Sequence, residues 1–386
     1  MQPINPFYFD FDKNDIEQFQ EESAKILSSG VLILGEYTKR FEDDFARFAG
    51  TKYAIGVNSG STALEFLLRI KDVRGKKVLC PTNTNFATVA AILRAGADVV
   101  YLDMTKETFA PSLQMVKTAV EKHGNSVAGV MWVHIAGIIA AEFPEAVDYC
   151  HQRGLFMLED AAHAHGSILN GKMAGNLADG GAFSFFPTKV MTTCEGGMIV
   201  TNDEHDDYIA RSLRNQGKRG VNYGNFHEDF GNSSRMTEIH ALIGSIQLQK
   251  LPQMLKARQH AYKVISKQLR EAGISFVSAD HMNAASQYKI IIHLPDGAGL
   301  KEMKATLAKE GVILGGGVYE MPCHVQPVFK GLCEVEQYPG AEQWCPRHIC
   351  PPVTSATTPE LAQYIGETLV KHLGAYTLET ADSPAA

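Results

Sequence analysis

The sequence predicts an α/β fold with a large, mainly parallel sheet followed by a smaller C-terminal α+β part. Between residues 53 and 158, short apolar segments alternate with helical segments of about ten residues, a pattern typical of parallel strands joined by helical crossovers. The last third of the chain differs, because one long helical segment precedes short strands and helices. We therefore expect a large domain over residues 1–250 and a small domain over residues 251–386.

Two amphipathic helices are expected before the alternating region. Apolar residues recur at helical spacing over residues 12–28 and again over residues 36–49. In the second segment, Phe41, Phe45 and Phe48 lie along one stripe. An aromatic stripe at this spacing is more often part of a core than of a binding surface, so we assign it to the core.

The alternating region and the segments after it predict the remaining elements. The expected strands cover residues 53–57, 77–80, 98–102, 127–133, 155–158, 181–186 and 197–201, and the expected helices between them cover residues 63–70, 86–95, 112–123 and 143–152. The C-terminal part predicts a helix over residues 238–269 (continuous, or broken near Pro252), a strand over 286–294, helices over 300–309 and 359–372, and the start of a strand at Val312.

The composition is that of a folded globular protein and argues against several partners. Hydrophobic residues make up 45% and charged residues 20% of the chain, which is enough apolar material for a sizeable core. The net charge of -7 argues against a nucleic acid or an anionic membrane surface as the main partner. We see no apolar run of the roughly 18 residues that a membrane span needs, and no signal peptide. Seven cysteines without a C-x-x-C pair suit reduced thiols, so we expect a cytoplasmic protein.

Polar residues follow three of the expected strands, where ligands of parallel sheets collect. Residues 58–62 (NSGST) link a strand to a helix, and the free N–H groups at such a helix start suit a phosphate. Glu159 and Asp160 end another strand, and Lys189 follows the strand at residues 181–186.

Each of these features has a simpler interpretation when it is taken alone. Ser59 or Ser61 could serve only as a helix cap, and Asp160 could be a cap or a metal ligand. Lys189 could lie on a surface hairpin, as most lysines do. No spaced set of carboxylates accompanies His163 and His165, so we expect no metal site.

Taken together, the three features match the needs of one cofactor. Pyridoxal 5'-phosphate requires a lysine that forms an imine, an acid that faces the pyridine nitrogen, and a helix start that binds the phosphate. Lys189, Asp160 and residues 58–62 supply these groups in one sheet. A lysine held between two apolar strands also has a lowered pKa, which makes its amine a nucleophile.

Several longer segments then identify a family. The chain resembles the sugar aminotransferases of the DegT/DnrJ/EryC1/StrS group, which have the aspartate aminotransferase fold (fold type I), and the similarity covers nearly the whole chain. The segments that carry the resemblance are residues 56–64 (GVNSGSTAL), 159–166 (EDAAHAHG), 183–189 (FSFFPTK), 195–197 (EGG), 234–238 (SRMTE) and 324–329 (HVQPVF).

The resemblance implies a role for each matching residue. Lys189 would bind the cofactor covalently and shuttle the proton, and Asp160 would form a charge-assisted bond to the ring nitrogen. The hydroxyl of Ser184 and the backbone N–H groups of Gly60 and Ser61 would bind the phosphate. A second set of residues is expected at the cofactor or the substrate: His163 near the ring oxygen, and Arg235, Tyr319 and His324 at the substrate. The alternative for His163 is a histidine at a helix end that faces solvent. The alternative for the loop at residues 315–329 is a structural connector that does not reach the substrate.

Four positions depart from the family pattern. Asn85 occupies the place of the aromatic residue that stacks on the cofactor, so either Phe86 replaces it after a local shift or a smaller group packs there. Ser233 stands where the family has an asparagine that reaches the phosphate in the partner subunit. Cys194 replaces a glycine, and we expect a buried, inert thiol. The usual proline and aspartate near residues 139–141 are also replaced.

The resemblance thus implies a homodimeric aminotransferase that depends on pyridoxal 5'-phosphate. The expected reaction moves an amino group from an amino acid, glutamate or glutamine, to a keto-sugar that is carried on a nucleotide, in sugar or polysaccharide biosynthesis. Three alternatives remain: a transaminase of a free sugar or polyol ketone, a keto-sugar dehydratase, and a non-catalytic regulatory relative. Lys189 argues against the dehydratases, which have histidine there, and the set of Lys189, Asp160 and Ser184 argues against a non-catalytic protein.

Overall fold

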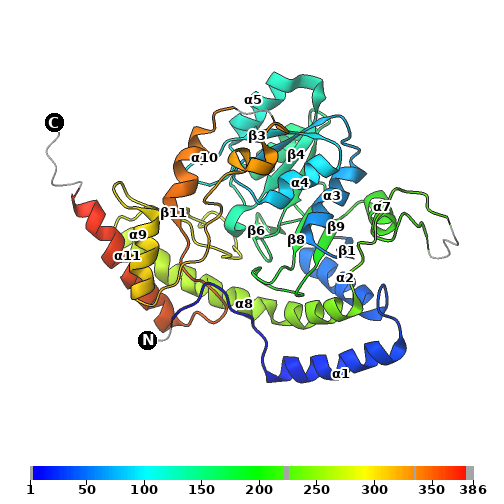
Figure 1. Cartoon of the computed structure of the whole chain (residues 1–386), viewed down its shortest axis with the longest axis horizontal. Helices are drawn as coiled ribbons and strands as arrows, with labels where there is room; N and C mark the ends of the chain where they lie inside the picture. The colour runs from blue at the N-terminus through cyan, green and yellow to red at the C-terminus, as the bar shows by residue number, and fades with distance from the viewer. Residues whose placement is uncertain (1–2, 221–225, 334–335, 380–386) are drawn as a thin grey trace.

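A seven-stranded sheet forms the centre of the structure (Figure 1). The computed structural model describes residues 3–220, 226–333 and 336–379. The sheet order is β1-β9-β8-β5-β4-β2-β3, with strands β1 (Tyr53–Val57), β2 (Lys77–Pro81), β3 (Asp98–Leu102), β4 (Val127–Val133), β5 (Phe156–Asp160), β8 (Gly181–Ser184) and β9 (Gly197–Thr201). Strand β9 is antiparallel to its neighbours β1 and β8, and the other neighbouring pairs are parallel. The predicted α/β fold with a mainly parallel sheet is therefore confirmed.

Helices precede, connect and follow these strands. They are α1 (Lys13–Ser29), α2 (Glu36–Ala49), α3 (Gly60–Ile70), α4 (Phe86–Arg94), α5 (Leu113–His123), α6 (Phe143–His151), α7 (Glu204–Arg214), α8 (Glu238–Glu271), α9 (Leu300–Lys309), α10 (Pro339–Trp344) and α11 (Pro359–Glu379). Short 3-10 helices cover Gly124–Ser126, Ile135–Gly137, Cys323–Val325, Pro327–Phe329 and Cys345–Arg347.

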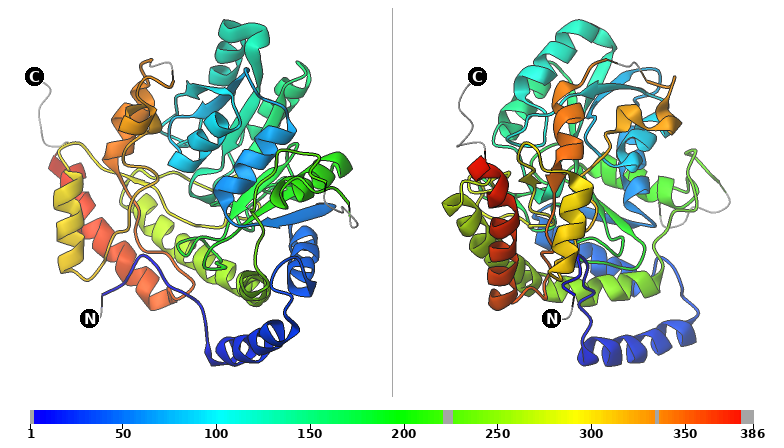
Figure 2. Two further views of the ribbon diagram at one scale, coloured as in Figure 1. Left: turned by 45° about the vertical axis from the view of Figure 1, so that its right-hand side comes forward. Right: turned by 60° about the vertical axis from the view of Figure 1, so that its left-hand side comes forward.

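Helices cover both faces of the sheet (Figure 2). One core lies between the sheet and helices α3, α4 and α7, and the other lies between the sheet and helices α2, α5 and α6. Strand β2 shows how the sequence serves both cores. Its residues Val78 and Cys80 join the first core, whereas Leu79 between them joins the second. Because side chains alternate along a strand, a strand covered on both faces must be apolar throughout, as the sequence pattern indicated.

Helix α8 links the sheet to the C-terminal part of the chain (Figure 1). It is continuous from Glu238 to Glu271 although it contains Pro252, which confirms the first of the two alternatives, a single long helix. The boundary expected between residues 250 and 251 lies inside this helix. The division into domains over residues 1–250 and 251–386 stays a prediction, and residues 380–386 lie outside the described part of the chain.

The C-terminal part contains less strand than the sequence predicts. Of the expected strand at residues 286–294, only Ile292 and His293 form a strand, β10, which pairs with β11 (His348–Ile349). Val312 does not open a strand, because it makes a single bridge to Ile4. The apolar alternation over residues 286–294 therefore reflects the burial of one face of the segment. Most of this segment has no neighbouring strand with which to form a ladder of hydrogen bonds. A third small sheet pairs β6 (Ile168–Leu169) with β7 (Lys172–Met173).

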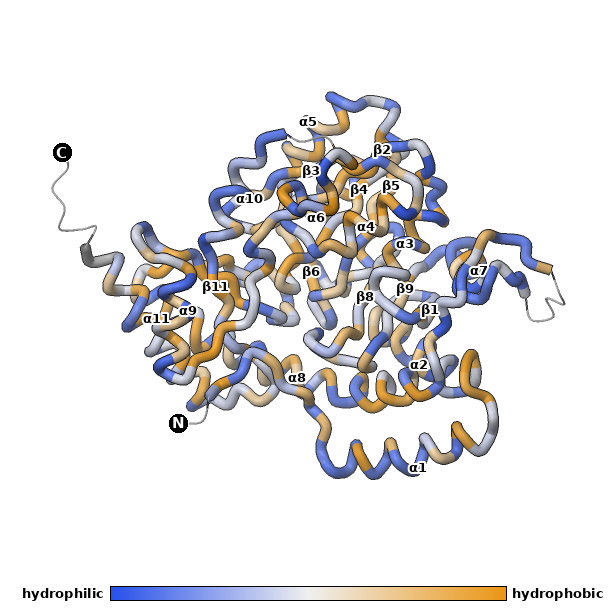
Figure 3. The backbone as a smooth tube through the Cα atoms, viewed as in Figure 1, coloured by the Kyte–Doolittle hydropathy of each residue, from blue (hydrophilic) through white to orange (hydrophobic). Residues whose placement is uncertain are grey.

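Helix α1 lies apart from the sheet, beside α8 and below α2, and apolar and polar residues alternate along it (Figure 3). Within the described residues, no helix combines the length and the apolar character that crossing a membrane requires.

The N-terminus of α2 is fixed by a buried carboxylate from α8. The Glu238 side chain accepts hydrogen bonds from the backbone N–H groups of Gly35 (3.0 Å), Tyr37 (2.8 Å) and Thr38 (3.1 Å), and from the Thr38 hydroxyl. The first N–H groups of a helix have no partner within the helix, so this carboxylate satisfies buried and partly buried groups that would otherwise lack a partner.

We expect Glu238→Ala to lower the free energy of unfolding by about 3 kcal/mol, because it leaves several buried N–H groups unsatisfied. Urea denaturation measures this change. The matched control is Glu17→Ala, which removes an exposed carboxylate 3.5 Å from Lys13 and should cost no more than about 0.5 kcal/mol. Equal losses in the two variants would contradict the anchoring role of Glu238.

Candidate active site

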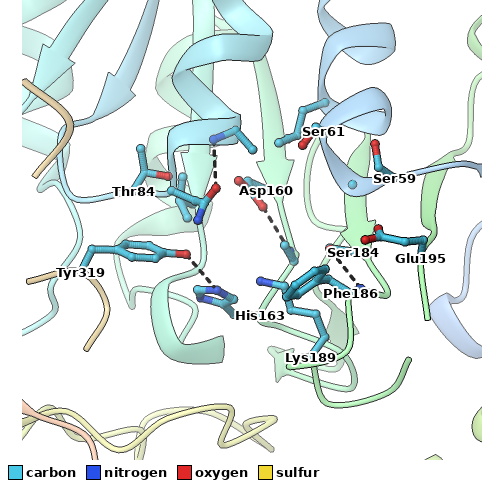
Figure 4. A pocket seen from close by; sticks show the side chains of 16 residues that line it. Ser59, Ser61, Thr84, Asp160, His163, Ser184, Phe186, Lys189, Glu195 and Tyr319 are labelled. Carbon is cyan, nitrogen blue, oxygen red and sulfur yellow. Dashed lines mark hydrogen bonds between the residues drawn. The ribbon is translucent and has the colours of Figure 1, made fainter. Parts of the chain in front are cut away.

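A cavity of about 290 Å³ opens where strands β4, β5 and β8 end and helices α3 and α4 begin (Figure 4). It lies at the carboxyl edge of the parallel strands, as expected for this class of fold. The lining residues are Ser59, Gly60, Ser61, Leu64, Thr84, Asn85, Ala87, Val133, Asp160, Ala162, His163, Ser184, Phe186, Lys189, Glu195 and Tyr319.

One wall of the cavity is the N-terminus of α3. The helix begins at Gly60, three residues earlier than the sequence pattern placed it, and Ser59 caps it by accepting a hydrogen bond from the Thr62 N–H (3.2 Å). Gly60 lies against Ser184, since a Cβ atom at residue 60 would come within 2.7 Å of the Ser184 Cβ. Because this close approach brings the serine hydroxyl to the helix start, the two form a cradle suited to a phosphate.

Asp160 supplies a carboxylate in the middle of the cavity. Its side chain is 4% exposed and accepts hydrogen bonds from the Thr88 hydroxyl (2.8 Å) and the Ala162 N–H (3.2 Å). Burial raises the pKa of this carboxyl, while the two hydrogen bonds and the charge of Lys189 oppose that shift. A cation placed against Asp160 would favour the ionised form further, so the residue suits a protonated ring nitrogen.

The neighbouring acid, Glu159, has a different environment. Consecutive residues of a strand point to opposite faces, and Glu159 points away from the cavity. Its carboxylate accepts hydrogen bonds from the N–H groups of Gly175 (2.7 Å), Leu177 (2.8 Å) and Ala178 (2.9 Å) and lies 2.8 Å from His134 Nε2. Glu159 therefore anchors a loop, and Asp160 is the acid of the pair that can meet a ligand.

Lys189 lies in the loop between β8 and β9 and faces the same cavity as Asp160 (Figure 4). Burial lowers the pKa of its ammonium to about 8; the charge of Asp160 opposes this shift, and that of Lys289 adds to it. Its Nζ also lies 5.3 Å from the ring centroid of Tyr288. The neutral, nucleophilic form of this amine is therefore far more populated near neutral pH than in an ordinary lysine.

His163 lies inside the cavity, which excludes the alternative of a solvent-facing histidine. Its ring stacks on Tyr288 at 4.2 Å, and its Nε2 lies 3.2 Å from the Tyr319 hydroxyl. Burial lowers the pKa of His163 well below the usual range, with the charges of Lys189 and Lys289 adding to this effect. The imidazole is therefore neutral and can offer one N–H and one acceptor nitrogen.

Four residues expected at the site do not line this cavity. Phe86 stacks on Phe329 instead (5.5 Å between centroids), so Asn85 rather than Phe86 faces the cavity. His324 turns away, because its Nδ1 lies 2.7 Å from the buried Thr82 hydroxyl. Ser233 and Arg235 interact with each other, and Arg235 also donates to the Asn215 side chain (3.0 Å).

The expectation of a buried thiol at Cys194 is wrong. This residue is exposed and has φ +70°. A positive φ favours glycine, which gives a physical reason for the glycine that the resemblance implies there.

Sequence reasoning missed several residues of the site. Phe186 and Glu195 line the cavity, although both stand within segments that carried the resemblance. Thr88 holds Asp160 from α4, and its place in the same family stretch as Asn85, residues 84–88, is the signal that could have found it. Tyr288 contacts His163 and Lys189 from a distant segment, and no pattern near Lys189 could have shown this.

The cavity has the groups that pyridoxal 5'-phosphate needs. An amine with a lowered pKa, a buried carboxylate and a phosphate cradle face one space, and a glycine at residue 60 lets the start of α3 pack against Ser184. These residues therefore fit the cofactor.

Comparisons with known proteins agree with this chemistry. The sequence pattern of the DegT/DnrJ/EryC1/StrS aminotransferase family matches residues 13–370. The chain is 30% identical over 362 residues to the pleiotropic regulatory protein of Geobacillus stearothermophilus (92% of this chain and 95% of that protein). It is 29% identical over 324 residues to the GDP-perosamine synthase of Vibrio cholerae (83% of this chain and 87% of that protein).

Among solved structures, the chain is similar to DesV of S. venezuelae in complex with a ketimine intermediate. The TM-score is 0.86 at 26% identity, and the match covers 97% of this chain and 99% of that chain.

We expect acetic anhydride to label Lys189 in the cofactor-free protein. The labelling rate should rise with pH, with a midpoint at about pH 8. The reagent attacks the neutral amine, whose fraction grows as the pH passes the pKa. Peptide mass spectrometry measures the rate, with exposed Lys263 as the internal reference. Asp160→Asn should move the midpoint to lower pH, because it removes the negative charge that favours the ammonium. An unchanged midpoint in that variant would mean that the two charges do not interact.

Proposed function

This chain belongs to the DegT/DnrJ/EryC1/StrS aminotransferase family, and from this premise we propose that it transfers an amino group from L-glutamate or L-glutamine to a nucleotide-linked keto-sugar. The enzyme is an aminotransferase that depends on pyridoxal 5'-phosphate. The observation that carries the proposal is the meeting of Lys189, Asp160 and the start of α3 in one cavity.

Lys189 carries the covalent and proton-transfer chemistry in this proposal. Bound pyridoxal 5'-phosphate supplies a ring that takes up the electron pair left when the donor's α carbon loses its proton. Lys189, with its lowered pKa, is suited to remove that proton and deliver it to the cofactor's carbon, and later to move a proton in the opposite direction on the sugar side. Asp160 holds the ring nitrogen in its protonated state.

The remaining lining residues bind and orient. Ser184, Gly60 and Ser61 hold the phosphate with a hydroxyl and two backbone N–H groups. His163, kept neutral by burial and placed by Tyr319 and Tyr288, would bind the ring oxygen of the cofactor. Asn85 caps α4 through the Ala87 N–H (2.9 Å) and lines the cavity, so it would supply a smaller contact to the cofactor than the usual aromatic residue.

The choice of substrate and reaction rests on similarity together with the site. The relatives named above include a GDP-perosamine synthase, a name that supports a nucleotide-linked sugar for this chain. Another relative is named a regulatory protein, but the presence of Lys189, Asp160 and Ser184 in one cavity supports an active enzyme. A lysine at residue 189 also favours amino transfer over dehydration.

We further propose a homodimer with shared active sites. Apolar side chains lie exposed near the cavity and beside α1, where a second chain would bury them. Examples are Phe86 and Phe186 near the cavity, and Val31, Leu32 and Ile33 after α1. Ser233 and Arg235 do not line the cavity of their own chain, which is consistent with a contact to the partner's cofactor.

A cytoplasmic location is part of the same proposal. All seven cysteines are free thiols, as is usual in a reducing compartment.

We expect L-glutamate to convert the yellow holoenzyme to the pyridoxamine form, with loss of the visible absorption. Lys189→Ala should abolish this conversion, and borohydride should no longer attach the cofactor covalently to the protein, because the imine-forming amine is gone. Absorption spectra and intact-protein mass spectrometry measure both effects. A wild-type enzyme that glutamate and glutamine leave yellow would refute the transaminase proposal, and covalent labelling in Lys189→Ala would mean that another lysine holds the cofactor.

We expect light scattering to give twice the chain mass of 42.2 kDa. Leu32→Asp should raise the dimer dissociation constant at least about tenfold, because it places a charge in a buried apolar contact. A monomeric wild-type protein with full activity would contradict the shared-site proposal.

A further inference from the structure

A second, narrow cleft lies beside the cavity, and Lys189 lines both. The N-terminal residues 6–8 form its outer wall, and Tyr288 separates it from His163. The residues that line this cleft are Pro6, Phe7, Tyr8, Pro187, Thr188, Lys189, Arg258, Tyr288 and Lys289.

Two of these residues are buried cations without an acidic partner. Arg258 and Lys289 are each only 6% exposed. Arg258 Nη1 donates to the carbonyl oxygens of Gln287 (3.2 Å) and Val353 (2.7 Å), and its Nε is buried without a partner. The Lys289 ammonium lies near two rings, 5.2 Å from the centroid of Phe7 and 5.7 Å from that of Tyr288.

The cleft therefore carries more positive charge than the surrounding protein offsets. Among the described residues, no carboxylate forms an ion pair with Arg258 or Lys289, and Asp160 in the adjoining cavity interacts with Lys189. Burying an unpaired cation is costly. Lys289 also stands between Tyr288 and Ile290 in a buried apolar segment, where an apolar side chain would cost less. An anion bound beside these two side chains would offset their charge.

We propose that Arg258 and Lys289 bind the α-carboxylate of the amino-acid donor. This inference rests on the proposed function. In transamination, the donor's carboxylate is bonded to the same carbon whose proton Lys189 moves, so the carboxylate must lie within a few ångströms of the Lys189 Nζ. Lys189 lines both the cavity and the cleft that holds the unpaired cations. A carboxylate bound in the cleft would therefore lie beside Lys189.

Access to the cleft depends on residues 6–8. Phe7 is 40% and Tyr8 51% exposed, so little packing holds these side chains in place. The segment is fixed at its two ends, by the Ile4 backbone bonds to Gly311 (2.8 Å) and Ile313 (3.1 Å) and by the Asp10 ion pair with Lys250 (2.8 Å). A carboxylate can therefore take the place of the Phe7 ring beside Lys289 without a rearrangement of the core.

The test uses two ligands that differ in the carboxylate alone. 2-Aminoisobutyrate has the amine and the carboxylate of a donor but no α hydrogen, so it binds the holoenzyme without being transaminated. tert-Butylamine replaces the carboxylate by a methyl group. Absorption titrations of the holoenzyme give the dissociation constant of each ligand. The variants are Lys289→Met, which removes the charge and keeps the length, Lys289→Arg, which keeps the charge, and Lys256→Met, an exposed control on the same helix as Arg258.

We expect Lys289→Met to weaken 2-aminoisobutyrate binding at least about tenfold, the loss of one charged contact, and to leave tert-butylamine binding within about twofold of the wild type. Lys289→Arg should retain most of the affinity for 2-aminoisobutyrate, and Lys256→Met should retain all of it. The thermal midpoint of Lys289→Met should rise, because a buried unpaired charge is removed.

Three results would overturn the inference. Unchanged 2-aminoisobutyrate binding in Lys289→Met would exclude a contact to the carboxylate. If Lys289→Met weakened the binding of 2-aminoisobutyrate and of tert-butylamine equally, Lys289 would act through the charge of Lys189 and not through the carboxylate. If Lys289→Met raised the half-saturation concentration for L-glutamate but not that for L-alanine, the cleft would bind the side-chain carboxylate of glutamate instead. A wild type that binds 2-aminoisobutyrate but does not convert L-glutamate or L-glutamine would refute the proposed function and leave this inference standing.

Discussion

The site depends on the burial of a lysine ammonium and an aspartate carboxylate in one cavity. Burial disfavours the charged form of both groups, lowering the pKa of Lys189 to about 8 and raising that of Asp160. Each charge partly offsets the cost of the other. A ligand that brings a cation to Asp160 and an anion to the start of α3 completes the charge balance. A phosphorylated pyridine meets both conditions, which is why the cavity suits it.

The fold supports this pair with buried carboxylates that have no part in the chemistry. Glu159 ties the loop around Gly175 to the end of β5, and Glu238 ties the start of α2 to α8. Both satisfy backbone N–H groups that would otherwise be buried without partners. Asp160 follows Glu159 directly in the strand, but its side chain projects from the opposite face. The division between structural and functional acids follows from the pleat of the strand.

Much of the site could be predicted, because Lys189, Asp160 and residues 58–62 follow expected strands and the family resemblance added Ser184. Lys189, Asp160, Ser184, Gly60 and Ser61 all lie in the cavity. The failures share a physical cause, which is that the direction of a side chain depends on partners far away in the sequence. Phe86 turns toward Phe329, and His324 turns toward Thr82. No local pattern contains that information.

The sequence by itself determined the alternation of strands and helices up to residue 201, the mainly parallel sheet and the family, because hydrophobic periodicity and short motifs are local properties. Only the tertiary structure decided which charges are buried together. Lys289 and Arg258 come from segments far from Lys189 along the chain, and all three residues line one cleft together with Tyr288. The pKa of a group depends on its desolvation and on its neighbours in space. The electrostatic character of the site therefore follows from the packing of distant segments.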